Sequence, residues 1–152
     1  MEFVQLPVLG LDAAEMRTVL DNMKTLGREY TLAAKRGFAH GFSNMNQMMQ
    51  DLFAGTRKVL PCGAGIGLLA VGTEGDLALC HRFTGTEFPK FGDIRSGLAR
   101  QELSDFLTDA QRAHPACQTC RARSICAGGC YHEAYVQQGD ALSPTFTHCD
   151  FV

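Results

Sequence analysis

Apolar residues recur at three- and four-residue steps through the first third of the chain and predict two helices. The first is expected to begin after Asp12, because Asp12 and Glu15 have the spacing of a capping box, and to stop at Gly37. The second is expected to begin at Ser43 and to end before Gly55. We interpret the apolar stripes as core-facing, with methionine as filler. They comprise Met16, Val19, Leu20, Met23, Leu26, Tyr30, Ala33 and Ala34, then Met45, Met48, Met49, Leu52 and Phe53.

The middle of the chain predicts shorter elements. Apolar runs at 68–71 and 77–79 flank a turn sequence at 72–76 and predict a β-hairpin, and a third helix is expected within 97–113. Two strands alone are marginal in water, so we expect the part of the chain after residue 58 to lack a hydrophobic core of its own. Residues 3–11 are typical of the end of a strand. The predicted fold class is α+β: two N-terminal helices, a β-hairpin, a helix and a loop-rich, cysteine-ligated cap.

Composition excludes several classes of protein. The chain has 152 residues, 45% of them hydrophobic, and a formal net charge of -2. No apolar run approaches the roughly 20 residues of a membrane span, and the acidic N-terminus lacks the basic start of a secretory signal. The near-neutral balance gives no support for a nucleic-acid-binding face. We therefore expect a cytoplasmic protein that binds neither membranes nor nucleic acid.

Cysteine is the unusual component. An odd count cannot be fully paired within one chain, and clustered thiols in a reducing compartment more often hold metal than form disulfides. The seven cysteines are Cys62, Cys80, Cys117, Cys120, Cys126, Cys130 and Cys149. A Cys-x2-Cys turn, as in Cys117-x2-Cys120, lets two thiolates converge on one metal centre. Gly128 and Gly129 supply the backbone freedom that a close approach to an inorganic core requires.

The number of thiols leaves the metal open. One zinc ion would leave three thiols unused, and two zinc ions or two four-iron clusters would both be one ligand short. A zinc-stabilised structural or binding module without a redox role therefore remains an alternative. A thiol–disulfide protein built on Cys117 and Cys120 is a weaker one, because no thioredoxin-like βαβ pattern surrounds that pair.

The complete cysteine spacing resembles that of a known family. It reads Cys62-x12-Gly75-x4-Cys80, then Cys117-x2-Cys120-x5-Cys126-x3-Cys130, then Cys149. This resembles the seven-cysteine signature of the SPASM domain, the C-terminal auxiliary iron–sulfur domain of many radical S-adenosylmethionine (radical SAM) enzymes. The segments PCGAGIGLLAV, FGDI and CRARSICAGGCYHEA are similar to members that mature ribosomally made peptides. The resemblance spans residues 62 to 149.

The resemblance implies two auxiliary 4Fe–4S clusters. Cys62, Cys80 and Cys130 would ligate the first, and Cys117, Cys120, Cys126 and Cys149 the second. Some family members have a further cysteine a few residues before the first, but the stretch GTRKVLP contains none, so the fourth ligand of the first cluster is open to a substrate thiolate, solvent or a local side chain. His81, His132 and His148 adjoin motif cysteines and are candidates either for that ligand or for hydrogen bonds that tune a cluster.

The resemblance also implies a division of the chain. Residues 1–57 would be the tail end of a radical SAM barrel with connecting helices, and 58–152 the SPASM-type domain. The Cys-x3-Cys-x2-Cys motif that holds the cofactor-cleaving cluster is absent, so we expect a fragment, inactive alone, whose intact parent uses S-adenosylmethionine. Its expected partners are the barrel domain and a substrate peptide or small protein subunit. The resemblance implies that the parent enzyme matures this substrate by forming thioether cross-links. The two clusters would relay electrons and help to position the substrate.

The remaining polar residues carry less specific signals. Arg82, Arg121 and Arg123 would offset the negative charge of thiolate-ligated clusters or meet an acidic substrate peptide. Glu74 and Asp76 are interpreted as turn residues. If metal–sulfur bonds replace the missing core, the metal-free chain should be poorly structured.

Overall fold

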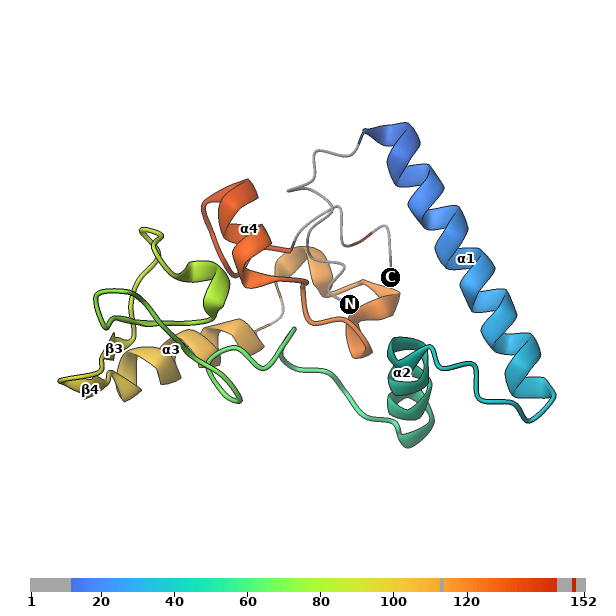
Figure 1. Cartoon of the computed structure of the whole chain (residues 1–152), viewed down its shortest axis with the longest axis horizontal. Helices are drawn as coiled ribbons and strands as arrows, with labels where there is room; N and C mark the ends of the chain where they lie inside the picture. The colour runs from blue at the N-terminus through green and yellow to red at the C-terminus, as the bar shows by residue number, and fades with distance from the viewer. Residues whose placement is uncertain (1–11, 113, 145–148, 150–152) are drawn as a thin grey trace.

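The computed structural model describes residues 12–112, 114–144 and 149 and has the α+β architecture that the sequence predicts. Two two-stranded antiparallel sheets and several 3-10 helices accompany the α-helices in this part of the chain (Figure 1). The α-helices are α1 (Ala13–Lys35), α2 (Ser43–Ala54), α3 (Arg100–Gln111) and α4 (Tyr131–Gln138), and the strands are β1 (Ala70–Val71), β2 (Leu77–Ala78), β3 (Gly92–Asp93) and β4 (Gly97–Leu98). The strand end expected at 3–11 lies outside the described residues. None of the described helices is both long and apolar enough to cross a membrane.

Both N-terminal helices begin and end where the sequence predicts. The Asp12 side chain accepts hydrogen bonds from the backbone of Ala14 and Glu15, and the Glu15 side chain accepts one from the Asp12 backbone, which completes the capping box. After α1 the chain turns at Gly37, which has a φ of 75°, and Gly55 ends α2 in the left-handed conformation.

The apolar stripes of α1 and α2 do not form the core, so that prediction was wrong. Tyr30 Oη donates a hydrogen bond to Asn46 Oδ1 at 2.7 Å, which joins the two helices. However, α2 buries none of its residues, and Phe53 is 96% exposed. The physical reason is their position: the two helices occupy one end of the molecule, away from α3, α4 and the hairpins (Figure 1). Two helices with so few contacts to each other cannot enclose their apolar side chains.

The predicted hairpin forms, and a second hairpin accompanies it. In the first, Ala70 pairs with Ala78 and Val71 with Leu77. Gly75 allows its turn because it has a φ of 92°, which a side chain would strain. The second hairpin pairs β3 with β4, and an isolated bridge between Asp76 and Asp93 links the two hairpins.

The hydrophobic core is built from the part of the chain after residue 58, contrary to the expectation that this part lacks one. Leu79 and Phe83 are fully buried, and the rings of Phe83 and Phe88 pack with centroids 4.1 Å apart. The reason is that aromatic side chains from the loops, α3 and α4 converge on the hairpin. The buried cluster comprises Ala64, Ala78, Leu79, Phe83, Phe88, Phe91, Leu103, Tyr131 and Ala141.

Helix α4 corrects the expectation of an irregular cap. Cys130 occupies its N-cap position in extended backbone geometry, and Gly139, with a φ of 73°, ends it. Its buried side chains are Tyr131, Glu133 and Ala134. The helix therefore fixes a motif cysteine against the aromatic core.

Candidate metal centres

Three cysteines from distant parts of the sequence share one neighbourhood. Cys80 follows the buried Leu79 and precedes the 3-10 helix η2 (His81–Phe83), and Cys130 precedes α4. Burial raises the pKa of the Cys80 thiol; the backbone N–H groups of Arg82 and Phe83 oppose this shift, and the nearby Cys130 and Cys62 add to it. Since each of the two thiols acts on Cys80, we define Cys62, Cys80 and Cys130 as the first group.

A half-buried cation accompanies the first group. Arg82 Nη1 donates to Cys130 Sγ at 3.7 Å, and Arg82 Nη2 donates to Glu133 Oε1 at 2.6 Å. The Arg82 and Glu133 side chains are only 13% and 5% exposed. The guanidinium thus stands where it can compensate negative charge on sulfur, as the sequence suggested for Arg82. The role of Glu133 was missed, because an acidic residue in a helix is ordinarily exposed.

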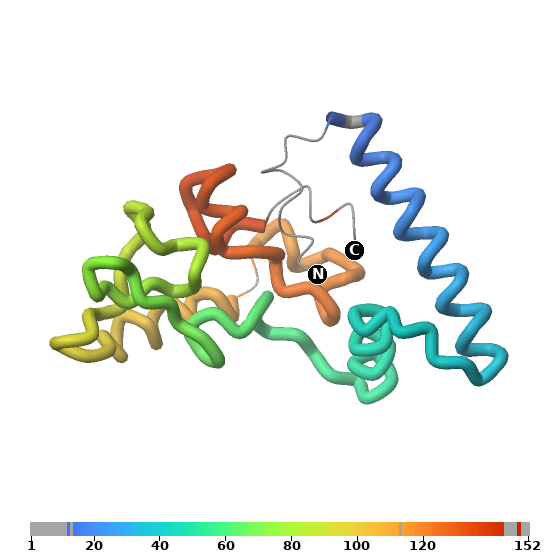
Figure 2. Tube along the Cα trace, in the orientation of Figure 1, coloured from blue at the N-terminus to red at the C-terminus, as the bar shows by residue number. Residues whose placement is uncertain are grey.

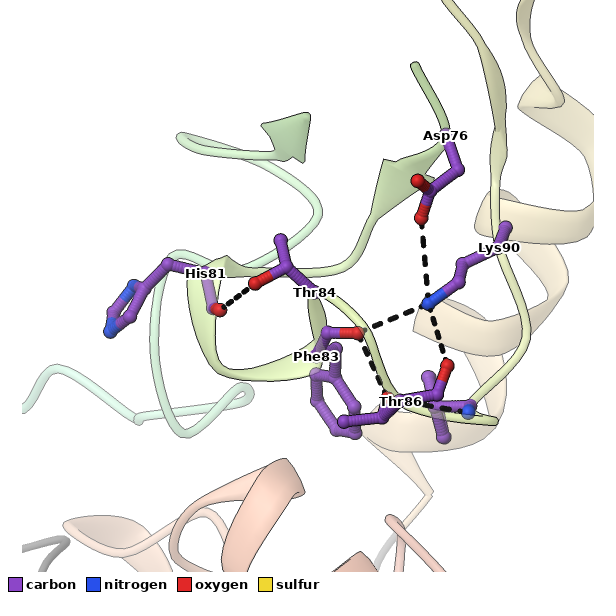
Figure 3. A network of polar contacts seen from close by, with 7 residues as sticks. Asp76, His81, Phe83, Thr84, Thr86 and Lys90 are labelled. Atoms are coloured by element: carbon purple, nitrogen blue, oxygen red, sulfur yellow. Dashed lines mark hydrogen bonds and ion pairs between the residues drawn. The ribbon is translucent and has the colours of Figure 1, made fainter. Parts of the chain in front are cut away.

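The loop after Cys80 is held by a lysine (Figure 3). Lys90 Nζ donates to the carbonyl oxygens of Phe83 and Thr86, at 3.1 and 2.9 Å, and lies 3.5 Å from Asp76 Oδ2. Asp76 therefore has a structural role beyond the turn, because it links the hairpin to the segment that carries Cys80. No sequence pattern pointed to Lys90.

The other four cysteines line one cavity of about 140 Å³: Cys117, Cys120, Cys126 and Cys149. We define them as the second group. Burial raises the pKa of the Cys117 thiol, Cys126 and Cys120 raise it further, and Arg123 acts in the opposite direction. The lining thus brings Cys149 together with three thiols that lie at least 23 positions earlier in the chain.

Short 3-10 helices position the second group. Cys117 ends η3 (Pro115–Cys117), and Cys120 precedes η4 (Arg121–Ser124). The Gly128 N–H donates to Cys126 Sγ at 3.4 Å, a contact typical of thiolate ligands. Gly128 has a φ of 98°, a conformation that favours glycine, although a Cβ built there would meet no described atom within 4 Å. The close approach to an inorganic core stays a prediction.

Basic residues line the cavity of the second group. Its lining includes Arg57, Lys58, Arg112 and Arg123. The first two arrive on the segment that follows α2 and leads to the centre of the molecule in Figure 2, where Lys58 N donates to Ser124 O at 3.0 Å. Of the arginines that the sequence suggested, Arg123 lines the cavity and Arg121 is exposed. The other three basic residues were missed because only tertiary folding brings them here.

The candidate histidines occupy different environments. His81 is exposed, and Figure 3 shows its ring pointing away from the Lys90 contacts. His132 is half-buried with its ring 5.2 Å from that of Phe83, and its Nδ1 has no hydrogen-bond partner among the described residues. Burial lowers the pKa of His132, and the Arg82 charge lowers it further. His148 lies outside the described residues, and ligation by any histidine stays a prediction.

The seven thiols are grouped without forming a closed coordination shell. Among the described residues, no set of three or more His, Cys, Asp and Glu side chains is arranged to hold a metal ion. The membership of the two groups is that of the two clusters that the resemblance implies, and ligation itself stays a prediction. The donor set fits the clusters in kind, because thiolate is their usual ligand. In the comparisons with known proteins, neither a family model nor a curated protein matches the chain.

Proposed function

We propose that this chain is an iron–sulfur module of the SPASM type that holds two 4Fe–4S clusters. The observation that carries the proposal is the division of seven thiols into a group of three, around Cys80, and a group of four, around one cavity. Cys62, Cys80 and Cys130 would hold the first cluster, and Cys117, Cys120, Cys126 and Cys149 the second.

The size and charge of the cavity lined by the second group favour a centre with several metal ions. Its volume of about 140 Å³ is far above the roughly 10–15 Å³ that one water molecule requires, so a single ion would leave most of the space unused. Four thiolates and a cluster carry net negative charge, and the four basic residues of the lining would compensate it. The same reasoning applies to Arg82 beside Cys130.

The first group supports a centre with one open ligand position. Three thiols leave one iron of a four-iron cluster to a substrate thiolate, to solvent or to a neighbouring side chain such as His132. That position would let the first cluster help to position a substrate, whereas the second has a full set of cysteines.

The chain would act as part of a larger enzyme. Bound clusters of this kind accept and release single electrons. The residues of this chain would hold them, exclude water and set their charge balance, next to a radical SAM barrel that modifies a peptide or small protein subunit. The segments CHRFTG and CAGGCYHEAY most resemble the maturase of quinohemoprotein amine dehydrogenase, which favours thioether cross-linking as the reaction.

Anaerobic reconstitution with iron and sulfide tests the proposal. We expect about eight irons and eight sulfides per chain, with the broad visible absorbance of thiolate-ligated clusters. A colourless protein that takes up stoichiometric zinc and no iron would contradict the proposal and favour the zinc-stabilised module.

Two matched variants test the division into groups. Replacing Cys80 and Cys130 by serine should remove the first cluster alone, and replacing Cys120 and Cys126 should remove the second alone. Each variant should retain about four irons. Loss of all iron from both variants would show that the thiols form one shared site instead of two.

A further inference from the structure

Tyr131 has a buried hydroxyl that no described residue satisfies. It is the first residue of α4, directly after Cys130, and is 5% exposed. Its ring packs edge-on against Phe106, with centroids 5.3 Å apart. Its hydroxyl oxygen is buried and has no hydrogen-bond partner in the described part of the chain. Leaving such a group unpaired is unfavourable, so the position calls for an acceptor that the described residues do not supply.

Tyr131 directly follows Cys130 in the chain, and the Cys62 thiol is close enough to act on its phenol electrostatically. A tyrosine hydroxyl carries an O–H that can donate a hydrogen bond to an acceptor in this region. A neutral O–H directed at an anionic, sulfur-rich centre is a favourable contact, and hydrogen bonds to sulfur are among the features that set the reduction potential of a cluster.

We propose that the Tyr131 hydroxyl donates a hydrogen bond to a sulfur atom of the centre held by Cys62, Cys80 and Cys130, as a positioning residue and not as a ligand. This inference rests on the proposed function. Reduction adds negative charge to the centre, so a donor stabilises the reduced form more than the oxidised form and makes the potential more positive. The open iron position remains available to another ligand.

The test compares Tyr131→Phe with wild type in the reconstituted full chain. The variant keeps the ring that packs against Phe106 and removes only the hydroxyl. We expect unchanged iron content, one of the two midpoint potentials shifted to a more negative value, and the other potential unchanged, in a redox titration monitored by electron paramagnetic resonance. Tyr135→Phe, one helical turn later, is the matched control and should leave both potentials unchanged.

The outcomes separate the inference from the proposed function. Wild type without iron would contradict the proposed function itself. Two clusters in both proteins with identical potentials would overturn the hydrogen bond. Loss of iron from the variant, or a new paramagnetic signal typical of a changed ligand set, would also overturn it, because the phenol would then be a ligand.

Discussion

Arg82 and Glu133, 51 positions apart in the sequence, meet in a 2.6 Å ion pair beside the Cys130 sulfur. Arg82 belongs to the turn that follows Cys80, and Glu133 to the first turn of the helix that follows Cys130. The pair therefore ties together the two segments that carry these cysteines.

Removing Glu133 should destabilise the protein. Glu133→Ala removes the buried carboxylate that accepts a hydrogen bond from the half-buried Arg82 guanidinium, and losing a hydrogen bond to a charged group costs about 1.5–3 kcal/mol. The measurement is the free energy of unfolding by denaturant. The exposed pair between Arg112 and Asp109 provides a control, since Asp109→Ala should cost less than about 1 kcal/mol. Equal losses in the two variants would mean that the buried pair does not hold the fold.

Lys90 should contribute more to stability than an exposed lysine does. Lys90→Met removes the donor to the Phe83 and Thr86 carbonyl oxygens, and we expect a loss of about 1–3 kcal/mol. Lys24, whose side chain is 64% exposed, is the control, and Lys24→Met should change the unfolding free energy by less than about 0.5 kcal/mol. A Lys90 variant as stable as the Lys24 variant would argue against this role.

The start of α1 should depend on pH through Asp12. Hydrogen bonds from the backbone N–H groups of Glu15 and Ala14 hold the pKa of Asp12 below its ordinary value of 3.8. The cap therefore stabilises the helix fully above that value and loses its effect as pH falls through the lowered pKa. Asp12→Asn caps without titrating. Circular dichroism should show a helix loss at acidic pH that is smaller in this variant, and identical acid titrations would refute the assignment.

Removing iron from the reconstituted protein should loosen one region more than another. The 3-10 helices η3 and η4 bury none of their residues, so the metal centre is their main expected constraint. Leu79 and Phe83 are fully buried in a core of apolar and aromatic side chains that pack on one another. Hydrogen exchange should therefore accelerate at residues 115–126 while amides at 78–83 stay protected. Equal acceleration in both segments would support the original expectation of a chain that is unstructured without metal.

Local signals in the sequence predict the elements of this fold well. The Asp12 capping box and Gly55 mark helix ends because they satisfy or release backbone groups at single positions. The Gly75 turn marks the hairpin for the same reason. Helix α4 was missed because its eight residues give too short an apolar pattern after the cysteine-rich segment 117–130.

The core and the surroundings of the cysteines could not be predicted in the same way. Phe83, Phe88 and Phe106 follow no common period in the sequence, and they form a core because separate segments converge. The same holds for Arg57 and Lys58 beside the second group. The groups of cysteines themselves were predicted only through the resemblance, since spacing alone does not determine which distant thiols meet.

The order of the cysteines along the chain constrains how this module can be inherited. The first group spans residues 62–130 and the second spans 117–149, so their sequence ranges overlap over residues 117–130. No single break in the polypeptide yields two pieces that each carry a whole group. Gene fusion or recombination can therefore transfer the two groups together. It cannot transfer one whole group without part of the other.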